Sequence, residues 1–287
     1  MPPAAACDPG VDILLQQAAA DVPVLRATAD EIARLRAEQE RVSGNALAAA
    51  ILRDPLMTLR VLRFLYSHRT RSQTVDITTI AHAIMMLGQA RFFREFEQLP
   101  TLEERLDGAV LEQVRALMSR SRLAALFARD WALQRHDIDP EEIMVAALLH
   151  DSAHLLLVLC AMPVDVESSL ADQLRAQLLA RLEVPGLVAE LNDETAAPNP
   201  RVVNVRLACV LARHCYAGWP SAPIQDDLAQ LQRFLRTSQP QAWERVRKIA
   251  LAAAREWDYY RTLPALALLP FVADESSSVA ADPGCGI

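Results

Sequence analysis

Apolar residues recur along most of the chain at the three- and four-residue intervals of a helix with one buried side. The longest such segment predicts a helix over residues 110–136, with Val114 and Leu123 on its apolar side. The chain has only 8 glycines, and its 17 prolines stand mostly at the edges of these segments. The pattern therefore predicts an all-α protein with short connections between its helices.

One stretch departs from this pattern because it is apolar on nearly every side. The pair Asp139-Pro140 supplies a capping acid and a proline at the first helical position, which predicts a helix from Glu141 to Cys160. A membrane span is the alternative interpretation of such a run. Asp151 near its centre would cost about 3 kcal/mol or more in lipid, and the run has no basic flank. We therefore expect a core helix surrounded by other helices.

Three titratable residues lie in the middle of that run: His150, Asp151 and His154. A buried carboxylate must be hydrogen-bonded, paired, protonated or bound to a metal, because leaving it alone costs several kcal/mol. The trio could be half of a metal site, an imitation of the H-E-x-x-H zinc helix, or a polar cluster that fixes how helices pack. We favour the polar cluster, because two or three ligands on one helix do not complete a coordination shell.

A group of basic residues, which includes His68, lies toward the C-terminal end of the helix predicted to start at Asp54-Pro55. Cations at the end of a helix complement its dipole, and this is the favoured interpretation. The alternative is a binding site for an acidic partner or an anionic messenger such as a cyclic nucleotide. The residues that would contact such a ligand are Arg60, Arg63, Arg69 and Arg71.

Composition and charge narrow the classes of function. The 287 residues are 52% hydrophobic, which is ample for a core, and the net charge of −7 argues against general nucleic-acid binding. None of the five cysteines forms a C-x-x-C pair, so free thiols in a reducing cytosol are expected. The first residues show neither a basic n-region nor an apolar h-region, so no signal peptide is expected. These observations predict a cytoplasmic protein.

Four segments, in this order, resemble the successive signatures of HDOD domains. They read DVPVLRATADEIARL, ILRDPLMTLRVLRFLYS, DITTIAHAIMMLG and EEIMVAALLHDSAHLLL, within residues 21–220. HDOD domains are bacterial relatives of the HD-domain phosphohydrolases and serve as signalling output modules. The resemblance implies an HD-like multi-helix bundle with an N-terminal helical lobe and a C-terminal helical extension.

The resemblance also suggests a division of the chain. The predicted parts are an N-terminal tail and short helix at 1–20, an HDOD-like domain at 21–220 with lobes at about 21–107 and 108–220, a C-terminal helical extension at 221–271, and a disordered tail at 272–287.

The HD enzymes to which the resemblance leads hold a metal with an early histidine, an adjacent His-Asp pair and a later aspartate. His150 and Asp151 match the pair. The early histidine should lie near Met118 to Leu123, where this sequence has arginines and serines instead. His154 stands where a lysine is common. The resemblance thus implies a structural role for His150, Asp151 and His154, with no metal, no cofactor and no enzymatic activity.

We expect this chain to act by binding signalling proteins, in a groove between its two lobes, with no nucleic acid or membrane among its partners. A homodimer is a further option. The alternative function is a divergent metal-dependent HD-type phosphohydrolase built on the same trio. Its additional ligands would come from His214 and one of Asp193, Asp226 and Asp227. A zinc peptidase is less favoured, because no third ligand follows at a suitable spacing.

Overall fold

The structure is a computed structural model, and it describes residues 21–38, 42–68, 77–159, 179, 184–193, 199–217 and 222–264. In this part of the chain the fold is all-α, as predicted, and the only extended pairing is an isolated parallel bridge between Val24 and Thr101. The helices are α2 (Arg26–Ala37), α3 (Gly44–Ile51), α4 (Pro55–Ser67), α5 (Ile80–Leu87), α6 (Gln89–Glu95), α7 (Leu102–Arg105), α8 (Gly108–Gln134), α9 (Pro140–Leu148), α10 (Ser152–Leu159), α12 (Gly186–Leu191), α13 (Pro200–Ala217), α14 (Ala222–Leu235), α15 (Gln239–Ala254) and α16 (Trp257–Tyr260).

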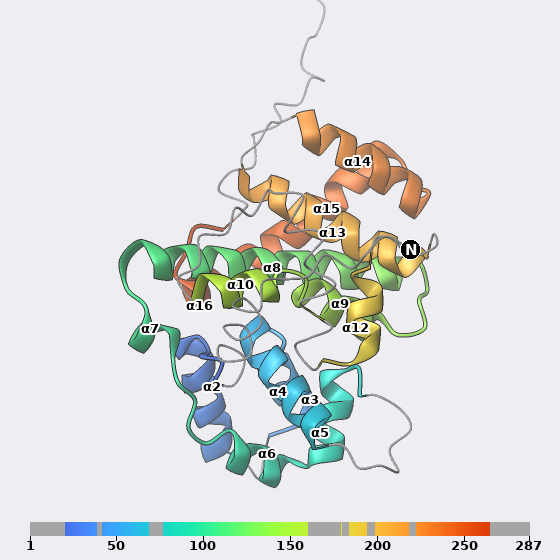
Figure 1. Cartoon of the computed structure of the whole chain (residues 1–287). Helices are drawn as coiled ribbons and strands as arrows, with labels where there is room; N and C mark the ends of the chain where they lie inside the picture. Colours follow the sequence, from blue (N-terminus) through green and yellow to red (C-terminus); the bar gives the residue numbers. More distant parts are fainter. Residues whose placement is uncertain are drawn as a thin grey trace, which may run out of the picture.

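Helix α8 is the axis of the molecule. Its 27 residues span roughly 40 Å at 1.5 Å per residue. Figure 1 shows the N-terminal helices α2 to α6 on one side of α8 and the orange helices α13 to α15 on the other. The helix predicted over 110–136 is confirmed, with both ends two residues earlier in the structure.

The start of α4 shows why the sequence folds as it does in the N-terminal lobe. Asp54 is fully buried and caps the helix, with Oδ1 accepting hydrogen bonds from the backbone N–H groups of Leu56 and Met57 at 2.8 and 3.0 Å. Its Oδ2 accepts from the Thr28 hydroxyl at 2.6 Å and from the Leu25 N–H at 3.0 Å. One carboxylate therefore starts α4 and also holds the first turn of α2 against it.

The predicted continuous helix over 141–160 is wrong, because a turn at residues 149–151 separates α9 from α10. The N–H of His150 bonds to Ala147 O at 3.4 Å and that of Ser152 to Leu149 O at 3.0 Å, so both pair with the carbonyl three residues earlier. The Ser152 hydroxyl also donates to Leu149 O. Such local bonds compete with the regular helix ladder. An unbroken apolar run indicates burial but carries no sign of this turn.

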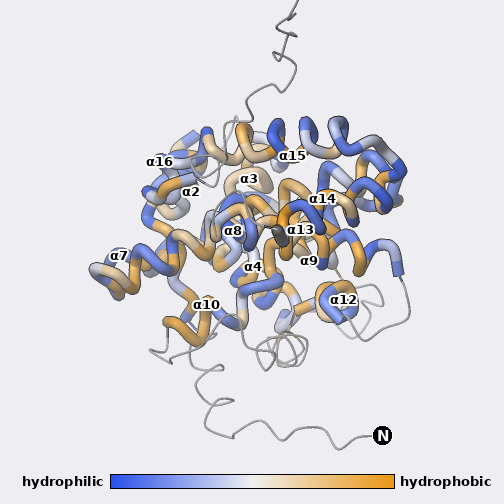
Figure 2. Tube along the Cα trace, turned by 90° about the horizontal axis from the view of Figure 1, so that it is seen from above, coloured by the Kyte–Doolittle hydropathy of each residue, from blue (hydrophilic) through white to orange (hydrophobic). Residues whose placement is uncertain are grey.

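The segment Pro140–Leu159 is long and apolar enough to cross a membrane by length and composition, and 83% of its 18-residue window is buried inside the protein. It is a core element, as predicted. Its trace is mostly orange in the hydropathy view, whereas α14 and α15 alternate between hydrophobic and hydrophilic positions (Figure 2). The amphipathic outer helices thus cover an apolar centre.

Buried apolar side chains in the described residues form two clusters. The first joins the N-terminal helices to the first half of α8, to α10 and to Tyr260 near the other end of the chain. The second lies between the later part of α8, α9, α13, α14 and α15. Helices α8 and α9 contribute to both clusters, so they connect the two cores. The division into domains predicted from the sequence stays a prediction.

Candidate functional site

The turn between α9 and α10 carries the His-Asp pair. The guanidinium of Arg120, on α8, donates through Nη2 to Asp151 Oδ2 at 2.7 Å. The Arg120 and Asp151 side chains are 13% and 11% exposed, so this ion pair is largely removed from water. The Nε2 atom of His150 lies 4.0 Å from Asp151 Oδ1. Asp151 is therefore neutralised by an arginine on the helix where the family resemblance places an early metal-binding histidine.

His150 is oriented by Asn192, at the end of α12. The Asn192 Nδ2 group donates to Ala146 O at 3.1 Å and to Val188 O at 2.8 Å, which makes Oδ1 the acceptor of this amide. His150 Nδ1 lies 2.7 Å from that oxygen and must be the donor. The hydrogen bond fixes the tautomer and the plane of the His150 ring. It also ties the turn at 149–151 to α12.

The donors in the described part of the chain do not fit a metal ion. A divalent cation needs several ligands converging on one point, and no three His, Cys, Asp or Glu side chains gather in that way among the described residues. A metal at Asp151 would also compete with the Arg120 guanidinium for the same carboxylate. His154 lies on α10 and is buried, and the structural role predicted for it and for the pair stays a prediction.

Two of the further ligands considered for a phosphohydrolase, His214 and Asp227, contact each other in the structure. His214 Nδ1 and Asp227 Oδ2 lie 2.5 Å apart and join α13 to α14. Burial raises the pKa of Asp227, against the opposing influence of His214. Asp226 is exposed, and Asp193 follows α12. Neither His214 nor Asp227 is grouped with His150 in a constellation that could hold a metal.

Only two of the four arginines in the predicted basic group, Arg60 and Arg63, lie among the described residues. Arg60 donates through Nη1 to Val22 O at 2.7 Å, and the same nitrogen lies 3.4 Å from Asp21 Oδ1. Arg60 therefore fastens the segment that leads into α2. Arg63 is half-buried, and Arg69 and Arg71 lie outside the described residues.

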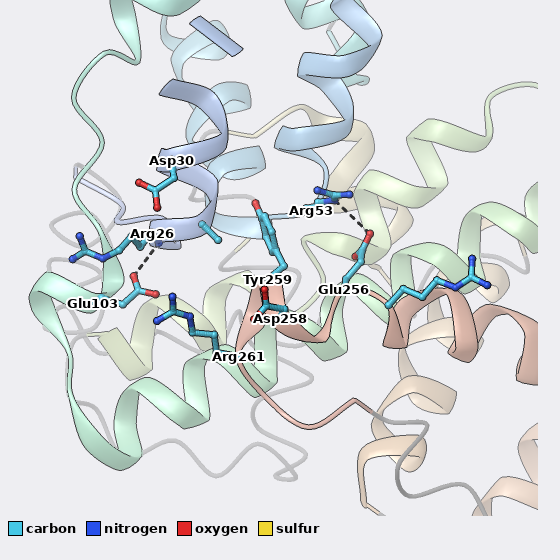
Figure 3. Close-up of a pocket in the computed structure, with 10 residues that line it drawn as sticks. Arg26, Asp30, Arg53, Glu103, Glu256, Asp258, Tyr259 and Arg261 are labelled. Atoms are coloured by element: carbon cyan, nitrogen blue, oxygen red, sulfur yellow. Dashed lines mark hydrogen bonds and ion pairs between the residues drawn. The ribbon is translucent and has the colours of Figure 1, made fainter. Parts of the chain in front are cut away.

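The structure reveals a second polar junction, which sequence reasoning did not find. Arg122 on α8 donates to both carboxylate oxygens of Glu256, at 2.9 and 3.0 Å, and to Leu52 O at 3.0 Å. Arg53 approaches the same carboxylate at 3.5 Å, as the dashed line in Figure 3 shows. Bidentate arginine–carboxylate pairs combine energy with fixed geometry. This junction fastens the turn before α16 to both α8 and the N-terminal lobe.

Two tyrosines of α16 complete the junction. The Tyr259 hydroxyl lies 2.7 Å from Thr28 Oγ1, which in turn donates to the buried Asp54. The hydroxyl of Tyr260 donates to Arg53 O at 2.5 Å, and its ring is buried in the first core cluster. These two hydrogen bonds fasten α16 to the body of the protein. Tyr259 forms one wall of an open pocket of about 360 Å³, shown in Figure 3.

A family model for the HDOD domain matches residues 22–189. The chain therefore belongs to the HDOD family, as the ordered segments predicted.

Two solved structures show the same fold. Both are of the MmoQ response regulator from Methylococcus capsulatus str. Bath, and the second is a fragment of that protein. The first is 20% identical, with a TM-score of 0.57, and the alignment covers 79% of this chain and 97% of that one. The second is 23% identical, with a TM-score of 0.55, and covers 73% and 90%. No curated protein sequence matches the chain.

Proposed function

We propose that this HDOD protein is a non-catalytic module of bacterial signal transduction that acts by binding other proteins in the cytoplasm. Membership of the HDOD family supports a role in signalling. The observation that carries the non-catalytic part is the ion pair between Arg120 and Asp151. The negative charge that an HD enzyme offers to its metal is here offered to a side chain of the protein itself.

The energetics of that pair support the same conclusion. A largely buried carboxylate needs a counter-charge, and breaking such a pair costs about 3 to 5 kcal/mol. A metal ion would have to displace the Arg120 guanidinium and leave that cation without its partner. Arg120 therefore makes metal binding at Asp151 unfavourable while preserving the packing of α8 against the turn at 149–151.

The proposed partners are signalling proteins, and a second copy of the chain is a further option. The net charge of −7 disfavours nucleic acid, and the burial of Pro140–Leu159 leaves that segment unsuited to a membrane. The groove between the lobes is our proposed docking region. We propose no cofactor.

Elemental analysis of the purified protein, combined with a phosphodiesterase assay on bis(p-nitrophenyl) phosphate with added Mn²⁺, tests the proposal. We expect no stoichiometric metal and no hydrolysis. Metal at one equivalent that disappears in His150→Ala, together with turnover, would sink it. Arg120→Gln serves as the matched control, because it removes the competing cation and leaves His150 and Asp151 in place.

One observation favours the metal-dependent phosphohydrolase as a second candidate. A metal-binding histidine usually donates its other ring N–H to an oxygen, and His150 donates Nδ1–H to Asn192 in that way. The same bond would also serve a purely structural histidine. The Asn192→Ala variant separates the two: under our proposal it lowers the free energy of unfolding, and it leaves the metal content unchanged.

A further inference from the structure

A concave surface lies where the end of α8 meets the connection between α14 and α15. It encloses about 540 Å³, a volume within the usual range of small-molecule sites. We call it the α14–α15 pocket. Leu235 and Ile249, both less than a tenth exposed, form an apolar part of its lining. Charged and amide side chains surround these two residues.

The acidic side chains of the α14–α15 pocket are already paired with cations. Asp130 accepts a hydrogen bond from Arg245 Nη1 at 2.6 Å. Both oxygens of Glu244 are bound by Arg247, at 3.0 and 3.1 Å. The carboxylates of this pocket therefore offer little negative charge to a ligand.

Two cations of the pocket remain available. Among the described residues, Arg236 makes no side-chain hydrogen bond or ion pair, and Lys248 makes none beyond its electrostatic influence on Glu244, which Arg247 already holds. The pocket therefore has an excess of positive charge in a chain whose net charge is −7.

The backbone at Arg236 adds to this argument. Its φ is 53°, in the left-handed region where glycine is favoured, and the N–H of Thr237 reaches back to Gln232 O at 3.1 Å to close the end of α14. An arginine here costs roughly 1 kcal/mol relative to glycine. The arginine at position 236 therefore destabilises the local backbone conformation relative to a glycine.

The amides of the pocket are also oriented as donors. Gln134 Oε1 accepts from Arg245 Nη2 at 2.8 Å. Gln241 Oε1 accepts from the N–H of Ser238 at 3.2 Å and from the Thr237 hydroxyl at 2.7 Å. Because these oxygens face obligate donors, both glutamines keep their NH₂ groups for other acceptors.

We propose that the α14–α15 pocket binds a small molecule that presents a phosphate group and is the size of a nucleoside monophosphate. Arg236 and Lys248 contact the phosphate, the NH₂ groups of Gln134 and Gln241 donate to its oxygens, and Leu235 and Ile249 contact the apolar part of the ligand. This site is separate from the His150–Asp151 turn and does not depend on the protein binding proposed for the groove between the lobes. A ligand bound at this site would act on the signalling module in addition to the proposed protein partner.

Isothermal titration of the full chain with AMP, with inorganic phosphate and with adenosine tests this proposal at low salt. AMP is expected to bind, and adenosine is not. Lys248→Gln and Arg236→Gly should each weaken AMP binding about tenfold or more, because a hydrogen bond to a charged group is worth at least that factor. Arg94→Gln, which removes an exposed arginine on α6, is the matched control and should leave binding unchanged.

The variant Arg236→Gly also distinguishes a loss of AMP binding from a loss of folding. It relieves the left-handed backbone, so the protein should unfold at a higher denaturant concentration while it loses AMP binding. Binding of phosphate alone with the same sensitivity to both variants also supports the site and assigns it to free phosphate. Absence of binding by AMP and by phosphate at millimolar concentrations would overturn the proposal, as would binding that both variants leave intact.

Discussion

Two arginines of α8, Arg120 and Arg122, make the most informative comparison in this molecule. They stand two residues apart, hence about 200° apart around the helix, and they reach in different directions. Arg120 holds Asp151 at the α9–α10 turn through one hydrogen bond, and Arg122 holds Glu256 near α16 through two. All four side chains are between 11% and 15% exposed.

The difference between the two pairs lies in what each one joins. The Arg120 pair stabilises a turn between consecutive helices, next to the one motif that the family resemblance singles out. The Arg122 pair joins α8, the N-terminal lobe through Leu52 O, and a carboxylate 134 positions away. The His-Asp motif therefore marks the junction at Arg120, but the junction at Arg122 connects more elements of the fold.

The largest expected effect comes from Arg122→Ala. It removes three hydrogen bonds and leaves Glu256 buried beside Arg53 alone, so the free energy of unfolding should fall by about 3 to 5 kcal/mol. Urea denaturation followed by circular dichroism measures this. Replacing the pair together, as Arg122→Met with Glu256→Leu, should recover most of the loss, since no charge is then left unpaired. A double variant as unstable as the single one would contradict this account.

Arg120→Ala should cost less, about 3 kcal/mol, at the lower end of the range for a broken buried pair, because one charged hydrogen bond is lost instead of three. The same denaturation measurement ranks the two variants. In the background of Asp151→Asn the further cost of Arg120→Ala should shrink to about 1 kcal/mol, because only a hydrogen bond to a neutral amide oxygen then remains to be lost. If Arg120→Ala proves the more damaging of the two arginine variants, the comparison is reversed.

Tyr259→Phe should lower the free energy of unfolding by about 1 kcal/mol, since it removes one hydrogen bond to Thr28 and keeps the ring. Thermal unfolding is a sufficient measurement. Thr28→Val, which also removes the donor to Asp54, should cost more than Tyr259→Phe. Equal effects would show that Asp54 gains nothing from the Thr28 hydroxyl.

A third arginine of α8 predicts a small effect of pH. Burial pushes the pKa of Glu103 up. The hydrogen bond from Arg115, the backbone hydrogen bonds to the carboxylate and the charge of Arg115 together outweigh it, so the pKa lies below its ordinary value of 4.5. A carboxyl with a lowered pKa in the folded state stabilises the fold above the unfolded pKa, and this stabilisation is lost as the pH falls through the folded value.

Glu103→Gln should therefore cost about 0.5 to 1 kcal/mol at neutral pH, because the amide oxygen can still accept the hydrogen bond from Arg115 and only the charge is lost. The difference from the unmodified protein should disappear as the pH falls from 4.5 into strong acid. Denaturation curves recorded at several pH values test this. A difference that persists in acid would mean that the contact with Arg115 does not depend on the charge of Glu103.

Local signals in the sequence predicted much of the fold. The acid-proline pairs at Asp54 and Asp139 start helices because their effect is confined to one turn, and both cap their helices in the structure. The long helix over 110–136 followed from its apolar spacing. The turn at 149–151 was missed, because the apolar residues on both sides are the same whether the backbone continues as a helix or turns.

The junction at Arg122 was missed for a different reason. A charged residue in an amphipathic helix has the same local pattern whether it faces water or a carboxylate far along the chain, and spacing carries no information about contacts over 134 positions. The stretch near Met118 to Leu123 was identified as the place where a metal ligand would stand. That an arginine there binds Asp151 followed only from the folded geometry.

The burial of Tyr260 has a consequence for how the chain is made. The cluster around the N-terminal helices includes this ring, which a ribosome adds about two hundred residues after the first of those helices. A nascent chain that has reached the end of the family match at residue 189 still lacks it. The lobe that emerges first therefore receives the last buried side chain of its core only when nearly all of the described part of the chain has been made.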